Sequence, residues 1–399
     1  MSCSLQIGDF REYLRYCCDY LRNEGVLVLM SLLLIFITPL DYILYIMWID
    51  SMEYYNWYAS SFIFPLFGIM SFYAGTKYLE YKGEIKEENK IEQNPLFLMG
   101  IMDGLNSTLG SIATPYLSII VMTILDKFTL PFIVLGSVMY LGRVYLKNHY
   151  LGVFLTIYAI MVSYLPNFSD GKFSEWWATL LFIISLIPAV ASYLLKEKYL
   201  DNKPVNIWWM NLWICIWQFC FGLFMFPVML IPFGEAGKNH IPSNNIGGYL
   251  KNATLCQFSG YNSTEKDHCD NSLLFMIMYQ IISTFINVLM LYIIRKGSST
   301  YFVIINSLKI PIQAWLASYR VLAGPNYKPI NLNDLFCFVL LIVATIVYND
   351  KEEIKGDKIN RTPLINLDED DHTQGINIIH NRNKNINIID DDDLSLGDV

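Results

Sequence analysis

The sequence is poor in charge: charged residues make up 16% of its 399 positions, while hydrophobic residues make up 54%. Because soluble chains carry about 25% charged residues, this composition argues against a water-soluble globular protein. Aromatic residues reach 15%, which argues against disorder over most of the chain. The apolar residues recur from residue 26 to residue 348. The composition therefore predicts an all-α protein that crosses the lipid bilayer several times.

The sequence also lacks the short motifs that usually accompany catalysis or metal binding. None of its five histidines lies inside an apolar run, and it contains no HExxH, GxSxG or Walker-type motif. Its eight cysteines form no CxxC pair, and no basic patch suggests nucleic-acid binding. We therefore expect no enzymatic activity, no cofactor, no metal site and no nucleic-acid partner.

Ten apolar runs have about the length of a membrane-spanning helix, which is about 20 residues. They lie near residues 26–48, 57–79, 96–116, 118–141, 150–166, 177–197, 206–232, 271–294, 300–322 and 333–349. Residues 5–22 have the spacing of an amphipathic helix, either on the cytosolic membrane surface or packed on a loop. The sequence thus divides into a cytosolic N-terminus (1–25), a ten-helix domain (26–350) and a disordered, acidic cytosolic tail (351–399).

The lysines and arginines orient these helices, because cationic loops stay on the cytosolic side. Cations gather before the first span and in every second loop, and they include Arg11, Arg15, Arg22, Lys77, Lys82, Lys86, Lys90, Arg143, Lys147, Lys196, Lys198, Lys203, Arg295 and Lys296. Both termini are therefore predicted to be cytosolic. The opposite loops hold sequons at Asn167, Asn252 and Asn262, where glycans would be added in the lumen. Cys256 and Cys269 lie in the same long lumenal loop, and they fit a disulfide in an oxidising compartment.

A few charged residues fall inside the apolar runs, namely Asp41, Asp103, Asp126, Lys127 and Lys309. Each costs about 2.5–3.5 kcal/mol on insertion scales, so each is either a functional residue or a member of a structural ion pair. Uncharged polar candidates accompany them: Asn106, Thr129, Gln218, Asn287 and Gln313.

Two prolines, Pro131 and Pro311, fall near the middle of the fourth and ninth spans. If the ten spans are two sets of five, these two positions are equivalent. A proline frees a backbone carbonyl one turn earlier, and matched helix interruptions are typical of a transporter's substrate site. Ordinary kinks are the alternative, since other spans contain Pro39, Pro65, Pro188 and Pro227.

Several short blocks stand out by their residues, their order along the chain and the spacing between them. They are GIMDG around Asp103, TLPF at 129–132, HYLG at 149–152, SLIP at 185–188, Gln218-Phe219, Pro227-Val228, Pro232-Phe233, and the stretch from Ser299-Thr300 through Pro311 to Leu322-Ala323-Gly324. Together they resemble the chloroquine resistance transporter-like (CRT-like) family of the drug/metabolite transporter superfamily, over about residues 96–324 and more loosely 26–350. The resemblance implies two inverted five-helix repeats around a central cavity lined by spans 1–4 and 6–9. It also implies an acidic endolysosomal or vacuolar membrane.

The sequence departs from the family pattern at several places. The lumenal loop has two cysteines where the family has four, and Ile286 stands beside Asn287 where the family carries an aspartate. Lys309 stands where a neutral polar residue is usual, and Asp126-Lys127 adds charge to the fourth span. The charges of the cavity are therefore particular to this chain, and the substrate does not follow from the resemblance.

The resemblance implies export of amino acids, small peptides or cationic drug-like solutes to the cytosol, although it does not say which of them. We predict a proton-coupled secondary transporter that works by alternating access, with a monomer favoured. Asp103 would bind a cationic group or a proton, and Asp41 is the second candidate for proton coupling. Polar contacts to the substrate would come from Asn106, Thr129, Gln218, Asn287, Lys309 and Gln313, with Pro131 and Pro311 breaking the helices. One alternative is a nucleotide-sugar or sugar-phosphate exchanger. A phosphate site needs cationic groups, and the candidates for this role, Lys127, Lys309 and Arg320, are few. A non-transporting membrane scaffold or receptor is another.

Overall fold

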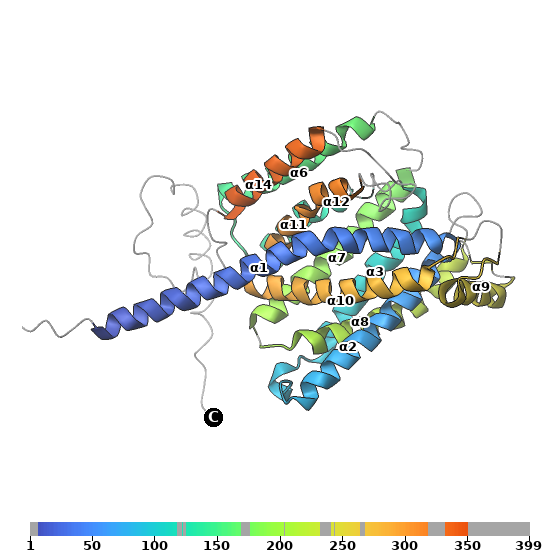
Figure 1. The fold of residues 1–399 in the computed structure, drawn as a ribbon, viewed down its shortest axis with the longest axis horizontal. Helices are drawn as coiled ribbons and strands as arrows, with labels where there is room; N and C mark the ends of the chain where they lie inside the picture. Colours follow the sequence, from blue (N-terminus) through green and yellow to red (C-terminus); the bar gives the residue numbers. More distant parts are fainter. Residues whose placement is uncertain are drawn as a thin grey trace, which may run out of the picture. The chain divides into compact units, whose positions relative to one another are not determined.

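The structure is a computed structural model, and it describes residues 7–117, 122, 125–168, 176–202, 204–231, 241–242, 244–263, 268–317 and 332–349. Every regular element within these ranges is helical (Figure 1). The acidic tail, for which disorder was predicted, and the cation Arg320 lie outside them.

The main elements of the described ranges are α-helices. They are α1 (Ile7–Ser51), α2 (Phe64–Tyr81), α3 (Gln93–Ala113), α5 (Thr129–Tyr140), α6 (Lys147–Phe168), α7 (Trp176–Asn202), α8 (Ile207–Phe224), α9 (Ile246–Ser259), α10 (Ser272–Lys296), α11 (Ser299–Ser307), α12 (Lys309–Ala317) and α14 (Leu332–Asn349). A π-helical segment, η2 (Tyr58–Ile63), leads into α2, and 3-10 turns are η1 (Glu53–Tyr55), η3 (Glu87–Asn89), η4 (Thr114–Tyr116) and η5 (Phe226–Leu230).

Six helical segments in the described ranges are long and apolar enough to cross a membrane: Gly25–Ile49, Tyr58–Tyr81, Glu87–Ala113, Trp176–Asp201, Ile207–Phe224 and Ser272–Lys296. They fall on six of the ten predicted spans. Helices α5, α6 and α14 and the pair α11–α12 fall on the other four, and the apolar stretches of α5 and α14 are shorter. The prediction of an all-helical, multi-pass membrane protein is confirmed, whereas the count of ten spans stays a prediction.

The N-terminal helix differs from the prediction of a separate amphipathic element. Helix α1 begins at Ile7 and continues without a break through the first span to Ser51, over 45 residues. Its N-terminal part extends beyond the neighbouring helices (Figure 1). The side chains before Gly25 lie outside the described part of the chain, so the predicted apolar face stays untested.

Helix breaks occur beside two of the prolines. A turn at Lys127 and Phe128 precedes α5, and a turn at Leu308 separates α11 from α12. Pro131 is the third residue of α5, and Pro311 is the third residue of α12. Each proline lacks the amide that would bond to the carbonyl four residues earlier, which places the interruption in the preceding turn.

The other prolines have different effects. Pro39 and Pro188 lie inside the continuous helices α1 and α7. The predicted seventh span ends early, because α8 stops at Phe224 and the chain continues as the 3-10 turn that holds Pro227.

The helices pack mainly in pairs. Helix α3 lies between α7 and α8, α2 packs on α8, α1 lies along α10, and α6 lies along α14 (Figure 1). The α3–α8 contact depends on two glycines one turn apart. A Cβ at Gly100 would lie 2.4 Å from Trp217 Cβ, and a Cβ at Gly104 would lie 2.7 Å from Phe221 Cδ1. This close approach is the role that small residues have in membrane helices.

The predicted lumenal loop contains a helix and a covalent link. A disulfide joins Cys256 in α9 to Cys269, just before α10. Trp48 of α1 donates a hydrogen bond from Nε1 to Gln257 Oε1 at 2.8 Å, which ties α9 to the end of the first span. Asn252 lies within α9, whereas Asn262 is exposed after the helix ends. Asn167 lies in α6, and its side chain is outside the described part of the chain.

Candidate functional site

A partly buried ion pair joins α3 and α7. Lys196 Nζ donates to Asp103 Oδ2 at 2.8 Å, and the two side chains are 5% and 21% exposed. The ammonium group also lies over the ring of Tyr193, 5.6 Å from its centroid. The sequence analysis counted Lys196 among the loop cations at the end of the predicted span 177–197, whereas in the structure it lies inside α7, which continues to Asn202. The ion pair therefore lies between two spanning helices.

The Asp103–Lys196 pair lines a cavity of about 340 Å³, which we call the Asp103 cavity. Its walls come from α1, η2, α2, α3, α7, α8 and α10. Four of the predicted substrate-binding residues line it: Asp103, Asn106, Gln218 and Asn287. The sequence analysis missed further polar residues in its walls, among them Tyr193, Lys196, Asn211 and Gln280.

Two of the missed residues point unused polar atoms into buried space. Asn211 Nδ2 and Gln280 Oε1 have no hydrogen-bond partner among the described residues, and both side chains are buried. Buried polar atoms are nearly always paired in folded proteins, with protein groups, water or a ligand. One is a donor and the other an acceptor, and both belong to side chains that line the Asp103 cavity.

A second cavity of about 260 Å³, the Asp126 cavity, adjoins the first. Five residues line both: Tyr45, Ser60, Asn106, Ser107 and Tyr193. The second cavity reaches the interruption before α5, where Lys127 Nζ donates to Asp126 Oδ2 at 3.0 Å. Thr129, another predicted substrate-binding residue, lies in its wall.

The remaining predicted residues, Asp41, Lys309 and Gln313, do not line either of these two cavities. Asp41 in α1 interacts electrostatically with Lys309, the first residue of α12, and Lys309 also interacts with Asp126 and Lys127. Asp41 Oδ1 and Gln313 Oε1 are buried and have no hydrogen-bond partner in the described part of the chain. These residues form a charged group beside the α11–α12 interruption.

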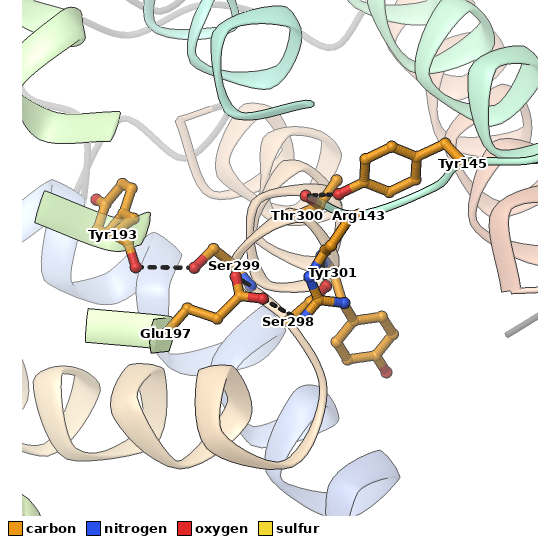
Figure 2. Close-up of polar contacts among 8 residues, drawn as sticks. All are labelled: Arg143, Tyr145, Tyr193, Glu197, Ser298, Ser299, Thr300 and Tyr301. Carbon is orange, nitrogen blue, oxygen red and sulfur yellow. Dashed lines mark hydrogen bonds and ion pairs between the residues drawn. The ribbon is translucent and has the colours of Figure 1, made fainter. Parts of the chain in front are cut away.

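A third polar group, which we call the latch, joins the ends of α5, α7 and α11 (Figure 2). Arg143, which follows α5, forms a buried ion pair with Glu197 of α7. The other carboxylate oxygen of Glu197 accepts a hydrogen bond from the amide of Ser299 at 2.8 Å. Ser299 Oγ in turn donates to the Tyr193 carbonyl at 2.9 Å.

The segment between α5 and α6, which holds Arg143, makes a second contact with α11. The hydroxyl groups of Tyr145 and Thr300 are 2.8 Å apart. Ser298 Oγ accepts from the Tyr301 amide at 3.0 Å and so caps α11. The positive-inside rule predicts that these helix ends lie on the cytosolic side. The latch thus joins α5, α7 and α11 at the end that sequence analysis predicts to be cytosolic.

Residues 27–348 match the sequence model of the family described as CRT-like, chloroquine-resistance transporter-like. The chain belongs to the CRT-like family. The match includes every helix that lines the two cavities, so both lie in the part of the chain that CRT-like proteins share.

Individual relatives agree with this family. The chain is 22% identical to "Chloroquine resistance transporter" of Toxoplasma gondii, over 69% of this chain and 33% of that protein. It is 23% identical to "Crt homolog 1" of Dictyostelium discoideum, over 74% of this chain and 66% of the relative. It is 22% identical to "Chloroquine resistance transporter" of Plasmodium falciparum, over 70% and 68% of the two chains. The match thus spans about a third of the Toxoplasma protein and about two thirds of the other two.

Proposed function

We propose that this CRT-like protein is a secondary active transporter that exports amino acids, small peptides or cationic drug-like solutes to the cytosol by alternating access. The observation that carries the proposal is the Asp103 cavity, a polar space lined by an ion pair and by the amide side chains of Asn211 and Gln280, each with a buried unpaired atom. It lies among apolar helices, where buried polar groups are costly unless they serve a site. An acidic endolysosomal or vacuolar membrane, with both termini cytosolic, is part of the same proposal.

Two inverted five-helix repeats are part of the proposal, and the helix contacts support them. With α5 as the fourth span and α11–α12 as the ninth, adding five to each span number exchanges several of the main helix contacts. The α3–α7 contact then corresponds to α10–α1, and α5–α7 corresponds to α12–α1. The contacts α2–α8, α6–α14 and α5–α11 each correspond to themselves. The interruptions before Pro131 and Pro311 also exchange under this rule, as expected for inverted repeats.

Asp41 and Asp103 are the proposed proton carriers. A proton carrier in a membrane is typically an acidic side chain inside the bundle. Asp41 has a buried, unpaired carboxylate oxygen close to the charges at the α11–α12 interruption. Asp103 lies in the cavity itself, so its protonation would weaken the bond to Lys196.

The phosphate-bearing substrates of an exchanger fit these cavities less well. Phosphate sites require an excess of cationic groups. Each lysine in the walls of the two cavities has an acidic partner, since Lys196 bonds to Asp103 and Lys127 bonds to Asp126.

The test is uptake by proteoliposomes that contain the full chain, with and without an imposed pH gradient. The panel holds labelled amino acids, short peptides, a cationic amphiphile and a nucleotide sugar. We expect gradient-driven uptake of at least one of the first three, reduced at least about tenfold by Asp103→Asn. Asp270→Asn, the same change at an exposed position, is the control and should leave uptake intact. Uptake of the nucleotide sugar alone, by exchange and without response to pH, would disprove the proposal.

A further inference from the structure

We infer that the Asp103–Lys196 pair recognises a zwitterion, with the substrate's ammonium group on Asp103 and its carboxylate on Lys196. This inference rests on the proposed function and narrows its substrate class. It assigns Lys196 to substrate binding and disfavours solutes that carry a single charge.

The balance of charge in the cavity is the first argument. Asp103 and Lys196 are the only charged side chains among the described residues that line the Asp103 cavity. The adjoining cavity is also balanced, because its charged lining residues within the described ranges are Asp126 and Lys127. A solute with no net charge leaves both cavities neutral.

The burial of the lysine is the second argument. A cation that displaced Lys196 from Asp103 would leave the ammonium group of Lys196, whose side chain is 5% exposed, without its counter-charge. An anion bound to Lys196 would leave Asp103 in the same position. Removing one partner of a buried pair is strongly unfavourable, and we expect it to weaken binding by about 100-fold or more. A zwitterion supplies both counter-charges, so two charge-assisted bonds replace one.

The unpaired atoms of the cavity match the same kind of solute. Asn211 Nδ2 is a donor suited to a carboxylate, and Gln280 Oε1 is an acceptor suited to an ammonium group. Both side chains are less than a tenth exposed, and neither atom has a hydrogen-bond partner in the described part of the chain. Phe72 and Met290 provide apolar wall for a substrate side chain. A volume of about 340 Å³ is at the small end of ligand pockets, which suits a single amino acid or a dipeptide.

The experiment compares three solutes of one shape and different charge: leucine (a zwitterion), leucinamide (a cation) and N-acetyl-leucine (an anion). Binding is measured as stabilisation of the detergent-purified full chain against heating, and transport as counterflow in proteoliposomes. We expect leucine to stabilise and to be exchanged, and the other two to need at least about 100-fold higher concentration. Equal or stronger binding of leucinamide would overturn the inference.

Two substitutions test the pair itself. Lys196→Gln gives the cavity a net negative charge and should shift the preference towards leucinamide, whereas Asp103→Asn should shift it towards N-acetyl-leucine. Lys251→Gln and Asp270→Asn, at exposed positions, are the matched controls and should keep the preference for leucine. If both cavity variants kept the wild-type preference, the pair would not be the recognition element.

The two readouts separate this inference from the proposed function. Selective stabilisation by leucine without exchange would keep the zwitterion site and reject the transporter. Exchange of leucinamide as readily as leucine would keep the transporter and reject the zwitterion site. If leucine neither stabilised the protein nor was exchanged, and a dipeptide tested in the same way gave the same result, the inference would be rejected. The wild-type comparison decides the question even if a variant fails to fold.

Discussion

Replacing one partner of the Arg143–Glu197 pair should destabilise the protein far more than removing an exposed ion pair. The two side chains are 5% and 3% exposed, so Arg143→Met leaves Glu197 as a buried carboxylate without its counter-charge. Breaking a buried pair in this way costs about 3–5 kcal/mol. At roughly 2 °C for each kcal/mol in a large domain, the apparent melting temperature should fall by about 6–10 °C.

The double variant Arg143→Met/Glu197→Gln should recover most of this loss. It removes both charges, and the glutamine carbonyl can still accept the hydrogen bond from the Ser299 amide. Replacing both members of a buried pair by uncharged groups is often close to neutral. The coupling between the two sites should therefore exceed about 2 kcal/mol in a double-mutant cycle.

The assay is thermal unfolding of the purified protein in one detergent, followed by the appearance of aggregated protein at a fixed heating rate. Lys77→Met, which removes an exposed pair with Glu80, is the control and should leave the melting temperature unchanged. Three results would refute the reasoning: a loss at Arg143 no larger than at Lys77, a double variant as unstable as the sum of its parts, or a gain in stability from the single change.

Three further outcomes are expected. Gly104→Val should lower the free energy of unfolding by about 1–3 kcal/mol, because the new side chain collides with Phe221 of α8. Gly110→Ala should leave the stability unchanged, since nothing lies within 4 Å of its added Cβ. Thermal unfolding measures both. Cys256→Ser should cost about 3 kcal/mol and expose one more thiol to a maleimide label. Asn262→Gln should reduce the gel shift caused by glycosidase, because Asn262 is exposed and its Oδ1, not its Nδ2, accepts the hydrogen bond from the Cys269 amide; an unchanged shift would contradict it.

Hydropathy placed the helices because the bilayer dictates the length and composition of whatever crosses it. The proline positions also located the two interruptions, since a missing amide acts on the residue's own turn. These features are local, so one sequence is enough to predict them. The predicted helix ends were less accurate: α8 stops at Phe224, before the end of its apolar run.

The partners of the charged residues could not be predicted in the same way. Lys196 and Arg143 were counted as loop cations because they lie near the ends of apolar runs, and nothing local distinguishes a buried lysine there from a solvated one. Their acids, Asp103 and Glu197, come from helices whose packing decides the contact. Asn211 and Gln280 carried a usable signal, since each is a polar residue inside an apolar run, as Gln218 is.

The sequence also could not show which of the predicted site residues face a cavity. Asp41, Lys309 and Gln313 were predicted to belong to the site, but they line neither of the two cavities. A list of spans does not say which face of a helix meets the centre of the bundle. Asp103, Asn106, Gln218 and Asn287 share one cavity because α3, α8 and α10 turn those faces towards it.

The two adjacent residues Lys196 and Glu197 constrain the orientation of α7. Successive helix residues point about 100° apart, and these two bond in different directions, to α3 and to the start of α11. Helix α7 therefore resists rotation about its own axis, because turning either way lengthens at least one charged contact. A rearrangement that turns α7 relative to both α3 and α11 must break at least one of these bonds, so single molecules should pause in long-lived states separated by abrupt jumps rather than drift smoothly between them.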